Sequence, residues 1–161
     1  MVASQRMLDL HPDLADLAFI LGTWAGEGDG DYPTTTPFRY RETLDFDHVG
    51  DDFILYTQES WTLDDEPLHF ERGVLRPSGP GRVELAMAHP IGLVELAEGT
   101  LEGSSIDVRS TTIARSSTGS AVTGLARRYT VSDDELTYQI DMSMDEVPST
   151  IHVWATLRRS R

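Results

Sequence analysis

Thr150-Ile151-His152-Val153-Trp154-Ala155-Thr156-Leu157 is a run of β-branched, aromatic and aliphatic residues that neither glycine nor proline interrupts. Such a composition is typical of a β-strand. Because alternate residues of a strand share a face, His152 and Trp154 are expected to point one way and the odd-numbered residues the other. The odd-numbered face is the more apolar one, so this run alone favours an outward histidine and does not identify His152 as a ligand.

Nine further strand-like runs precede this one, and turn signals rich in Gly, Asp, Ser and Pro separate most of them. Short, regularly spaced strands predict an all-β fold of about ten strands, with antiparallel neighbours. The nine runs are Thr23–Gly28, Phe38–Phe46, Phe53–Thr62, His69–Arg76, Arg82–Ala88, Leu93–Thr100, Ser105–Ile113, Val122–Val131 and Leu136–Ser143.

Clean alternation within these runs indicates that one face of the sheet is buried. Leu136, Tyr138, Ile140 and Met142, for example, alternate with polar residues. The simplest arrangement that hides the edges of so many consecutive strands is an up-and-down, calycin-like β-barrel. A barrel of about ten strands is too wide for its own side chains to fill, so a ligand cavity is expected inside.

The N-terminal part predicts a short helix before the first strand. His11-Pro12-Asp13 resembles a helix start, and Leu14 and Leu17 follow on one side, so the helix is expected to plug one barrel end. The chain of 161 residues suits a single domain spanning residues 1–161, with residues 1–10 expected to be mobile.

Composition excludes several classes of function. A net charge of −14 argues against binding to nucleic acid or to anionic membrane surfaces. The chain has no cysteine, which excludes disulfides, thiolate metal sites and cysteine nucleophiles. The apolar run at residues 17–21 is far shorter than the roughly 20 residues of a membrane helix, and no signal pattern precedes it. A cytoplasmic protein is expected.

The first predicted strand contains an unusual motif, Gly22-x-Trp24-x-Gly26-x-Gly28. Glycine weakens a strand, so three at even spacing indicate a sharp bend or a close approach by neighbouring atoms. Trp24 is placed to close the barrel end beneath a cavity. The motif matches neither a dinucleotide fingerprint nor a phosphate-binding loop.

This motif resembles the signature of the nitrobindin family, which are haem-binding β-barrels related in shape to fatty-acid-binding proteins. Four later blocks resemble the same family in the same order, so the resemblance spans nearly the whole chain, from Leu14 to Arg159. They are Tyr32-Pro33-Thr34-x-x-Pro37-Phe38-x-Tyr40-x-Glu42, Pro67-Leu68-His69-x-Glu71-x-Gly73-x-Leu75-Arg76, Gly92-Leu93-Val94-Glu95 with Gly99, and His152-x-x-Ala155-x-Leu157.

The resemblance implies a ferric b-type haem, one per chain, with His152 as the axial iron ligand. Thr34 falls on a haem-contacting threonine of the family, and Leu68 and His69 fall on the segment near the distal side. Family members bind nitric oxide and convert peroxynitrite to nitrate. Val74 replaces the family's usual aromatic residue before Leu75, which puts the shape of the distal pocket in question, as does Leu68 if it replaces a methionine. The face bearing His152 is then expected to point inward, against the apolarity of the strand.

Such a cofactor needs an apolar wall, for which the candidates are Trp24, Phe38, Tyr40, Leu68, Met87 and Trp154. The remaining charged groups are expected on wet surfaces, with Arg127 and Arg128 in exposed ion pairs of little energetic value. His89, beside Pro90, lies at a predicted strand end and is a weaker candidate than His152 for a place at the pocket.

Two other functions stay open. Arg127-x-Tyr129 resembles the carboxylate clamp of fatty-acid-binding proteins, which suggests a non-catalytic carrier of apolar ligands, although that clamp belongs on the last strand. The same open ferric site would also serve storage or sensing of haem or nitric oxide. The sequence does not decide between a monomer and a homodimer.

Overall fold

The computed structural model describes residues 8–160 and places one helix and ten strands in them. The helix is a 3₁₀ helix, and every predicted strand is present with slightly different bounds. The elements are η1 (Pro12–Ile20), β1 (Gly22–Tyr32), β2 (Thr35–His48), β3 (Ile54–Thr62), β4 (Pro67–Gly79), β5 (Arg82–His89), β6 (Leu93–Glu102), β7 (Ser105–Arg115), β8 (Val122–Ser132), β9 (Glu135–Met144) and β10 (Val147–Arg159).

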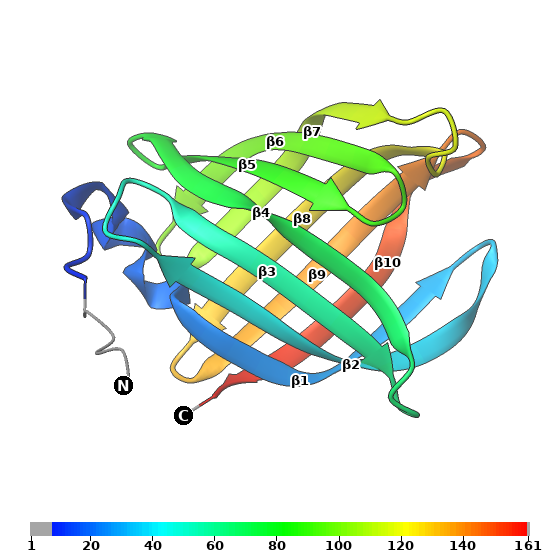
Figure 1. Ribbon diagram of the computed structural model, residues 1–161, viewed down its shortest axis with the longest axis horizontal. Coiled ribbons are helices and arrows are strands. Elements are labelled where there is room, and N and C mark those ends of the chain that lie inside the picture. Colours follow the sequence, from blue (N-terminus) through cyan, green and yellow to red (C-terminus); the bar gives the residue numbers. More distant parts are fainter. Residues whose placement is uncertain (1–7, 161) are drawn as a thin grey trace, which may run out of the picture.

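The ten strands form one closed antiparallel barrel (Figure 1). Each strand pairs with the next along the chain, and β1 pairs with β10 from Trp24↔Arg159 to Gly30↔Val153, which closes the sheet. Among residues 8–160, closure leaves no unpaired strand edge, as the sequence predicts for so many consecutive strands.

The helix η1 closes one end of the barrel, at the left of Figure 1. Pro12 begins it, and the His11 side chain accepts a hydrogen bond from the Asp13 backbone N–H, which caps the first turn. Leu14, Leu17 and Ile20 are fully buried in the barrel core. The Trp24 indole donates to the Ile20 carbonyl at 2.8 Å. The predicted plug and the position of Trp24 beneath it are therefore confirmed.

The glycines of β1 make room for aromatic rings from β2. A Cβ on Gly28 would lie 2.4 Å from the Tyr40 ring, and one on Gly30 would lie 2.2 Å from the Phe38 ring. The close approach that the glycine spacing predicts is thus made mainly by side chains. The absence of a Cβ at both positions lets the two rings pack directly against β1.

The last strand contains a β-bulge at His152. Ile151 pairs with Asp141 and Val153 pairs with Ile140, so β10 advances two residues while β9 advances one. An extra residue re-aims the side chains that follow it. His152 and Val153 therefore both line the barrel interior, while Ile151 and Trp154 face outward and are 47% and 40% exposed. The prediction that His152 and Trp154 share a face is wrong, because the bulge interrupts the strict alternation on which it depends.

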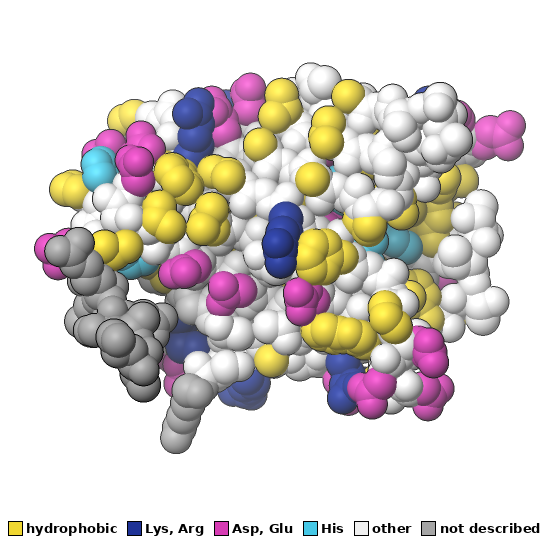
Figure 2. Space-filling model, in the orientation of Figure 1, with side chains coloured by type: hydrophobic (Ala, Val, Ile, Leu, Met, Phe, Trp, Pro, Cys, Tyr) yellow, Lys and Arg dark blue, Asp and Glu magenta, His cyan; other side chains and the backbone are white. Residues whose placement is uncertain are grey.

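The outer surface bears apolar side chains over β3 to β6. Figure 2 shows hydrophobic side chains gathered on this face. Leu55, Val74, Ala86 and Leu96 are cross-strand neighbours in one row, and Leu96 is 53% exposed. In the described part of the chain, the helix is too short to cross a membrane. The sequence predicts mobility for residues 1–10. Of these, residues 1–7 lie outside the described residues.

Candidate functional site

The barrel encloses a cavity of about 460 Å³. This volume lies within the usual range for small-molecule sites. Residues of the β1–β2, β5–β6 and β7–β8 connections line it, and these connections lie at the end of the barrel opposite η1 (Figure 1). The wall is mostly apolar and aromatic. Its apolar part consists of Phe38, Leu44, Leu68, Ile91, Leu93, Val122, Leu125, Ile140, Met142, Met144 and Val153, together with the chain's five tyrosines.

His152 is held at the cavity by three neighbours. Its Nδ1 lies 3.2 Å from the Asp31 carbonyl oxygen, so Nδ1–H donates to that oxygen and Nε2 keeps its lone pair. The Tyr32 ring packs edge-on at 5.2 Å between centroids, and the Phe38 ring lies at 6.3 Å. Burial lowers the pKa of His152, although the hydrogen bond to Asp31 opposes this. A neutral imidazole with one tethered nitrogen is the usual form of a metal-ligating histidine.

The other predicted site residues line the same cavity. Thr34 lies in the two-residue turn between β1 and β2, and Leu68 and His69 begin β4. The His69 Nε2 lies 3.3 Å from a Glu71 carboxylate oxygen, so this ring is tied to the cavity wall. The structure thus brings together all four residues that the sequence singles out, from three separate segments of the chain.

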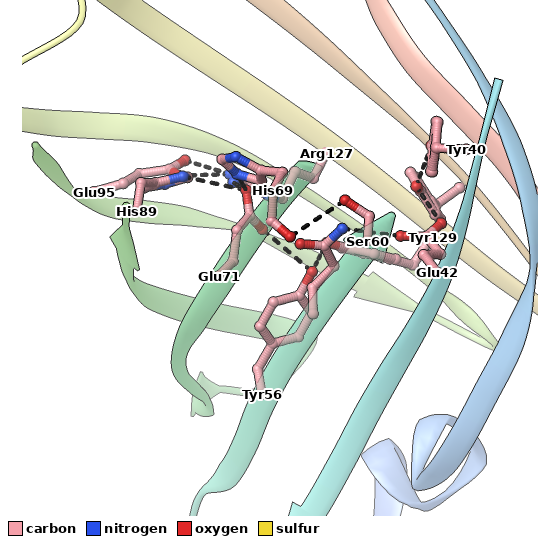
Figure 3. A network of polar contacts seen from close by, with 12 residues as sticks. Tyr40, Glu42, Tyr56, Ser60, His69, Glu71, His89, Glu95, Arg127 and Tyr129 are labelled. Carbon is pink, nitrogen blue, oxygen red and sulfur yellow. Dashed lines mark hydrogen bonds and ion pairs between the residues drawn. The ribbon is translucent and has the colours of Figure 1, made fainter. Parts of the chain in front are cut away.

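A buried charge cluster occupies one wall of the cavity, at the left of Figure 3. The Arg127 guanidinium is 1% exposed and lies 2.6 Å from both Glu95 carboxylate oxygens and 3.2 Å from Glu71. The His89 side chain lies between the same two carboxylates, with Nδ1 3.2 Å from Glu71 and Nε2 3.1 Å from Glu95. Two carboxylates therefore face two basic groups.

This cluster fixes the charges of its members. Burial favours a neutral His89, but the contacts with Glu71 and Glu95 raise its pKa overall. Both of its nitrogens face carboxylate oxygens, which only an imidazolium satisfies by donating twice. Burial likewise favours a neutral Glu71, yet Arg127, His69 and His89 hold the pKa of its carboxyl well below the usual range. The cluster is thus charge-compensated.

Compensation also argues against a metal ion in this wall. Ligand atoms of His69, Glu71 and His89 lie within 4.8 Å of one another, which is a spacing that could hold an ion. However, Arg127 already neutralises Glu71, and a protonated His89 has no lone pair to offer. His152 remains the site's candidate metal ligand.

A third buried carboxylate, Glu42, lines the same cavity without such compensation (Figure 3). Among residues 8–160, its hydrogen-bond partners are the Tyr138 hydroxyl and the Gln58 amide, the latter at 3.2 Å. The Tyr40 hydroxyl lies 2.5 Å from that of Tyr138. Burial raises the pKa of Glu42 to about 7, although both hydrogen bonds oppose the shift. This carboxyl therefore titrates near neutral pH.

The expectation that carboxylates and arginines lie on wet surfaces is wrong for four of these residues. Glu42, Glu71, Glu95 and Arg127 are all buried, whereas Arg128 makes the expected exposed pair with Asp107 at 2.6 Å. The sequence held a signal for three of them, because each interrupts the apolar phase of an alternating strand. They are Glu42 in Tyr40-x-Glu42-x-Leu44, Glu95 in Leu93-x-Glu95-x-Ala97, and Arg127 in Leu125-x-Arg127-x-Tyr129.

Two further expectations are decided by the same geometry. Arg127 and Tyr129 do share the inner face, but both terminal nitrogens of Arg127 are taken by Glu71 and Glu95, so the guanidinium is not free to clamp a fatty-acid carboxylate. Of the predicted wall residues, Phe38, Tyr40 and Leu68 line the cavity. Trp24 and Met87 pack in the core instead, and Trp154 lies outside the barrel.

A wide closed barrel that presents a tethered imidazole to an apolar cavity belongs to a class of protein that can hold an apolar, metal-bearing ligand. Comparison with known proteins agrees. Residues 13–159 match the family model described as "THAP4-like, heme-binding beta-barrel domain". The chain belongs to this family, the nitrobindins, as the resemblance predicts.

Curated relatives cover nearly the whole chain. "Peroxynitrite isomerase 1" of Mycolicibacterium paratuberculosis is 46% identical over 158 residues, which are 95% of this chain and 98% of that protein. "Peroxynitrite isomerase" of Nocardia farcinica is 44% identical over 160 residues, covering 96% and 95%. The crystal structure of Rv2717c from M. tuberculosis superposes with a TM-score of 0.89 at 42% identity and covers 95% of this chain and all of that one.

Proposed function

We propose that the chain binds one ferric b-type haem through His152 and isomerises peroxynitrite to nitrate. The main observation in support is the bulge in β10, which directs the half-buried His152 imidazole toward the apolar cavity. The haem-binding family and the names of relatives at 44–46% identity support the same activity.

The residues present fit this cofactor. The bond from His152 Nδ1–H to the Asp31 carbonyl leaves Nε2 as the donor atom for iron and sets the orientation of the ring. Phe38 and Tyr32 pack against the ring, so its rotation is restricted before any ligand arrives. Thr34 and Leu68, which line the cavity, would contact the macrocycle.

When bound, a ferric haem would supply a Lewis acid for a peroxynitrite oxygen and an open coordination position for a small ligand. The chain contributes fixation, exclusion of water and a confined space in which fragments recombine to nitrate. His69 lies on the segment that the family resemblance assigns to the distal side, and its contact with Glu71 holds its position. No protein acid or base is required.

Binding of nitric oxide at the same coordination position belongs to this proposal, because it needs no group beyond those that peroxynitrite needs. A cytoplasmic location also remains part of the proposal. Storage or sensing of haem or nitric oxide would use the identical site and differs only in whether turnover occurs.

The test is titration of the purified protein with ferric haem, followed by visible spectroscopy. We expect a sharp Soret band at one haem per chain, which is weakened or shifted in His152→Ala because the axial ligand is lost. His48→Ala is a matched control, since His48 lies at a turn at the closed end of the barrel. Peroxynitrite decay, followed by stopped flow, should be accelerated by the wild type and by the control. Identical spectra for wild type and His152→Ala would overturn the assignment of His152.

A further inference from the structure

All five tyrosines of the chain line the one cavity. Four of them form a continuous path across its interior, on strands β2, β3, β8 and β9. The Tyr40 and Tyr138 hydroxyls lie 2.5 Å apart, the Tyr138 and Tyr129 rings lie 5.9 Å apart, and the Tyr129 and Tyr56 hydroxyls lie 3.5 Å apart. The fifth, Tyr32, stands apart from this path and packs against His152.

Two members of the path, Tyr138 and the terminal Tyr56, each donate to a buried carboxylate. Tyr138 donates to Glu42, and Tyr56 donates to Glu71 at 3.3 Å. The two acceptors differ in their surroundings. Glu71 is already held by Arg127, His69 and His89, whereas the partners of Glu42 in the described residues are the neutral groups of Tyr138 and Gln58.

This difference matters for oxidation of a phenol. Loss of an electron makes a phenol strongly acidic, so the electron leaves readily only where a base takes the proton at the same moment. A carboxylate without a nearby cation is the better base, because no positive charge stabilises its ionised form. Tyr138, bonded to Glu42, is therefore the phenol of the path that loses an electron and a proton together most easily.

We propose that the Tyr40–Tyr138 pair, with Glu42 as proton acceptor, captures oxidising equivalents that escape from peroxynitrite in the cavity, and that this pair is the chain's site of self-nitration. The inference rests on the proposed function for the source of the oxidant. Homolysis of the O–O bond of peroxynitrous acid gives a hydroxyl radical and nitrogen dioxide, and the nitrogen dioxide that fails to recombine oxidises the pair.

Nitration of one ring consumes two molecules of nitrogen dioxide. The Tyr138 phenol gives one electron to the first, which becomes nitrite, and its proton moves along the existing hydrogen bond to the Glu42 carboxylate. The product is a neutral tyrosyl radical beside a protonated Glu42. The second nitrogen dioxide adds to the ring carbon next to the phenol oxygen, and the hydrogen of that carbon leaves as a proton, which yields 3-nitrotyrosine. Exchange with Tyr40 across the shared hydrogen bond spreads the radical over both rings.

Tyr32 provides an internal comparison. It is the tyrosine in contact with His152, so selection by proximity to the proposed iron site would place nitration there. Its hydroxyl donates to the Met142 carbonyl at 3.3 Å, and a carbonyl is a far weaker base than a carboxylate. Proximity to the proposed iron site thus predicts nitration of Tyr32, whereas contact with a proton-accepting carboxylate predicts nitration of Tyr138.

The experiment treats haem-loaded and haem-free protein with peroxynitrite and quantifies 3-nitrotyrosine at each position by peptide mass spectrometry. We expect Tyr138 and Tyr40 to exceed Tyr32 in both forms. In Glu42→Gln, which keeps an acceptor oxygen for Tyr138 but removes the base, nitration at Tyr138 and Tyr40 should fall by about tenfold or more, since general-base assistance is commonly worth about 10²–10⁴-fold. In the haem-free form, where the packing of Tyr32 on His152 has no part in holding haem, Tyr32→Phe is the control and should leave nitration at Tyr138 unchanged.

Dominant nitration of Tyr32 in the wild type, or an unchanged pattern in Glu42→Gln, would overturn the proposal. The wild-type pattern decides the matter even if Glu42→Gln does not fold. The haem-free arm separates this proposal from the proposed function, because peroxynitrite undergoes homolysis in water without haem. If the protein does not bind haem, the haem-free measurement still tests the tyrosine pair. If it binds haem normally but Tyr32 is the main nitrated residue, the proposal for the Tyr40–Tyr138 pair is wrong and the proposed function stands.

Discussion

Two walls of one cavity bury carboxylates in opposite ways. The first wall pairs the carboxylates of Glu71 and Glu95 with the basic groups of Arg127 and His89. The second surrounds Glu42 with Tyr138, Gln58 and, one bond further, Tyr40, all of them neutral. In the first wall the pKa of Glu71 is held well below its usual range, and in the second that of Glu42 is raised to about 7.

The difference shows that burial alone does not set the protonation state of a cavity carboxyl. Burial raises the pKa of both groups, and the sign of the net shift depends on whether a cation is in contact. In the first wall, contact with Arg127 and the two histidines therefore favours the ionised Glu71 carboxylate. The second wall is a proton acceptor poised at physiological pH, within the space where peroxynitrite is proposed to react.

The largest expected effect comes from removing the cation of the first wall. Arg127→Met should lower the free energy of unfolding by about 3–5 kcal/mol, because Glu71 and Glu95 are then buried without a full counter-charge. Urea denaturation measures it. Arg128→Met, on the same strand, removes only an exposed pair with Asp107 and should cost at most about 1 kcal/mol. Equal losses in both variants would contradict the charge compensation of the first wall.

The second prediction concerns pH and the other wall. The pKa of Glu42 is higher in the folded chain than its ordinary 4.5, so its stabilising contribution is present below pH 4.5 and is lost as pH rises through about 7. Relative to Glu42→Gln, the wild type should lose about 3 kcal/mol of unfolding free energy across that interval.

Glu71 acts with the opposite sign, since its lowered pKa gives stability that is present above pH 4.5 and lost on acidification. His89, whose pKa is raised, contributes stability below about pH 6.5 that is lost as pH rises through its folded value. Both contributions are shared by wild type and Glu42→Gln, so the difference between the two denaturation series isolates Glu42. A difference that does not vary with pH would show that Glu42 keeps an ordinary pKa.

The smallest expected effects come from removing one hydroxyl from each wall. Tyr138→Phe deletes one of two donors to Glu42 and leaves the Tyr40 hydroxyl without its partner, so a loss of about 1–3 kcal/mol is expected. Tyr56→Phe deletes a 3.3 Å bond to Glu71, which keeps Arg127 and two histidines, and should cost about 0.5–1.5 kcal/mol. Thermal unfolding compares them, and the reverse order would mean that Glu71 depends on Tyr56 more than on its cations.

Much of the fold could be predicted from the sequence because it depends on local rules. Alternation located all ten strands, and the His11-Pro12-Asp13 start located the helix. These features need only the period of a strand and the chemistry of a helix cap. The closure of β1 on β10 followed from the cost of free strand edges.

The site was only partly predictable, because its contacts join distant segments. His152, Thr34, Leu68 and His69 came from the family resemblance, and all four line the cavity. The pairing of Arg127 with Glu71 spans 56 residues, and no local pattern connects them. A polar residue in the apolar phase of a strand marks a buried group, as Glu42 shows, but the partner that decides its charge is visible only once the barrel is closed.

The bulge at His152 also affects how this strand could change in evolution. The residues from Val153 to Leu157 follow the barrel's inward alternation, and the histidine reaches the interior only through one extra residue. Loss of a single codon, that of Ile151, would restore unbroken alternation and turn the imidazole to the outer surface while leaving the rest of the wall in place. A one-codon deletion would therefore remove His152 from the cavity and leave the barrel in place, so the proposed iron ligand could be gained or lost in evolution without a change of fold.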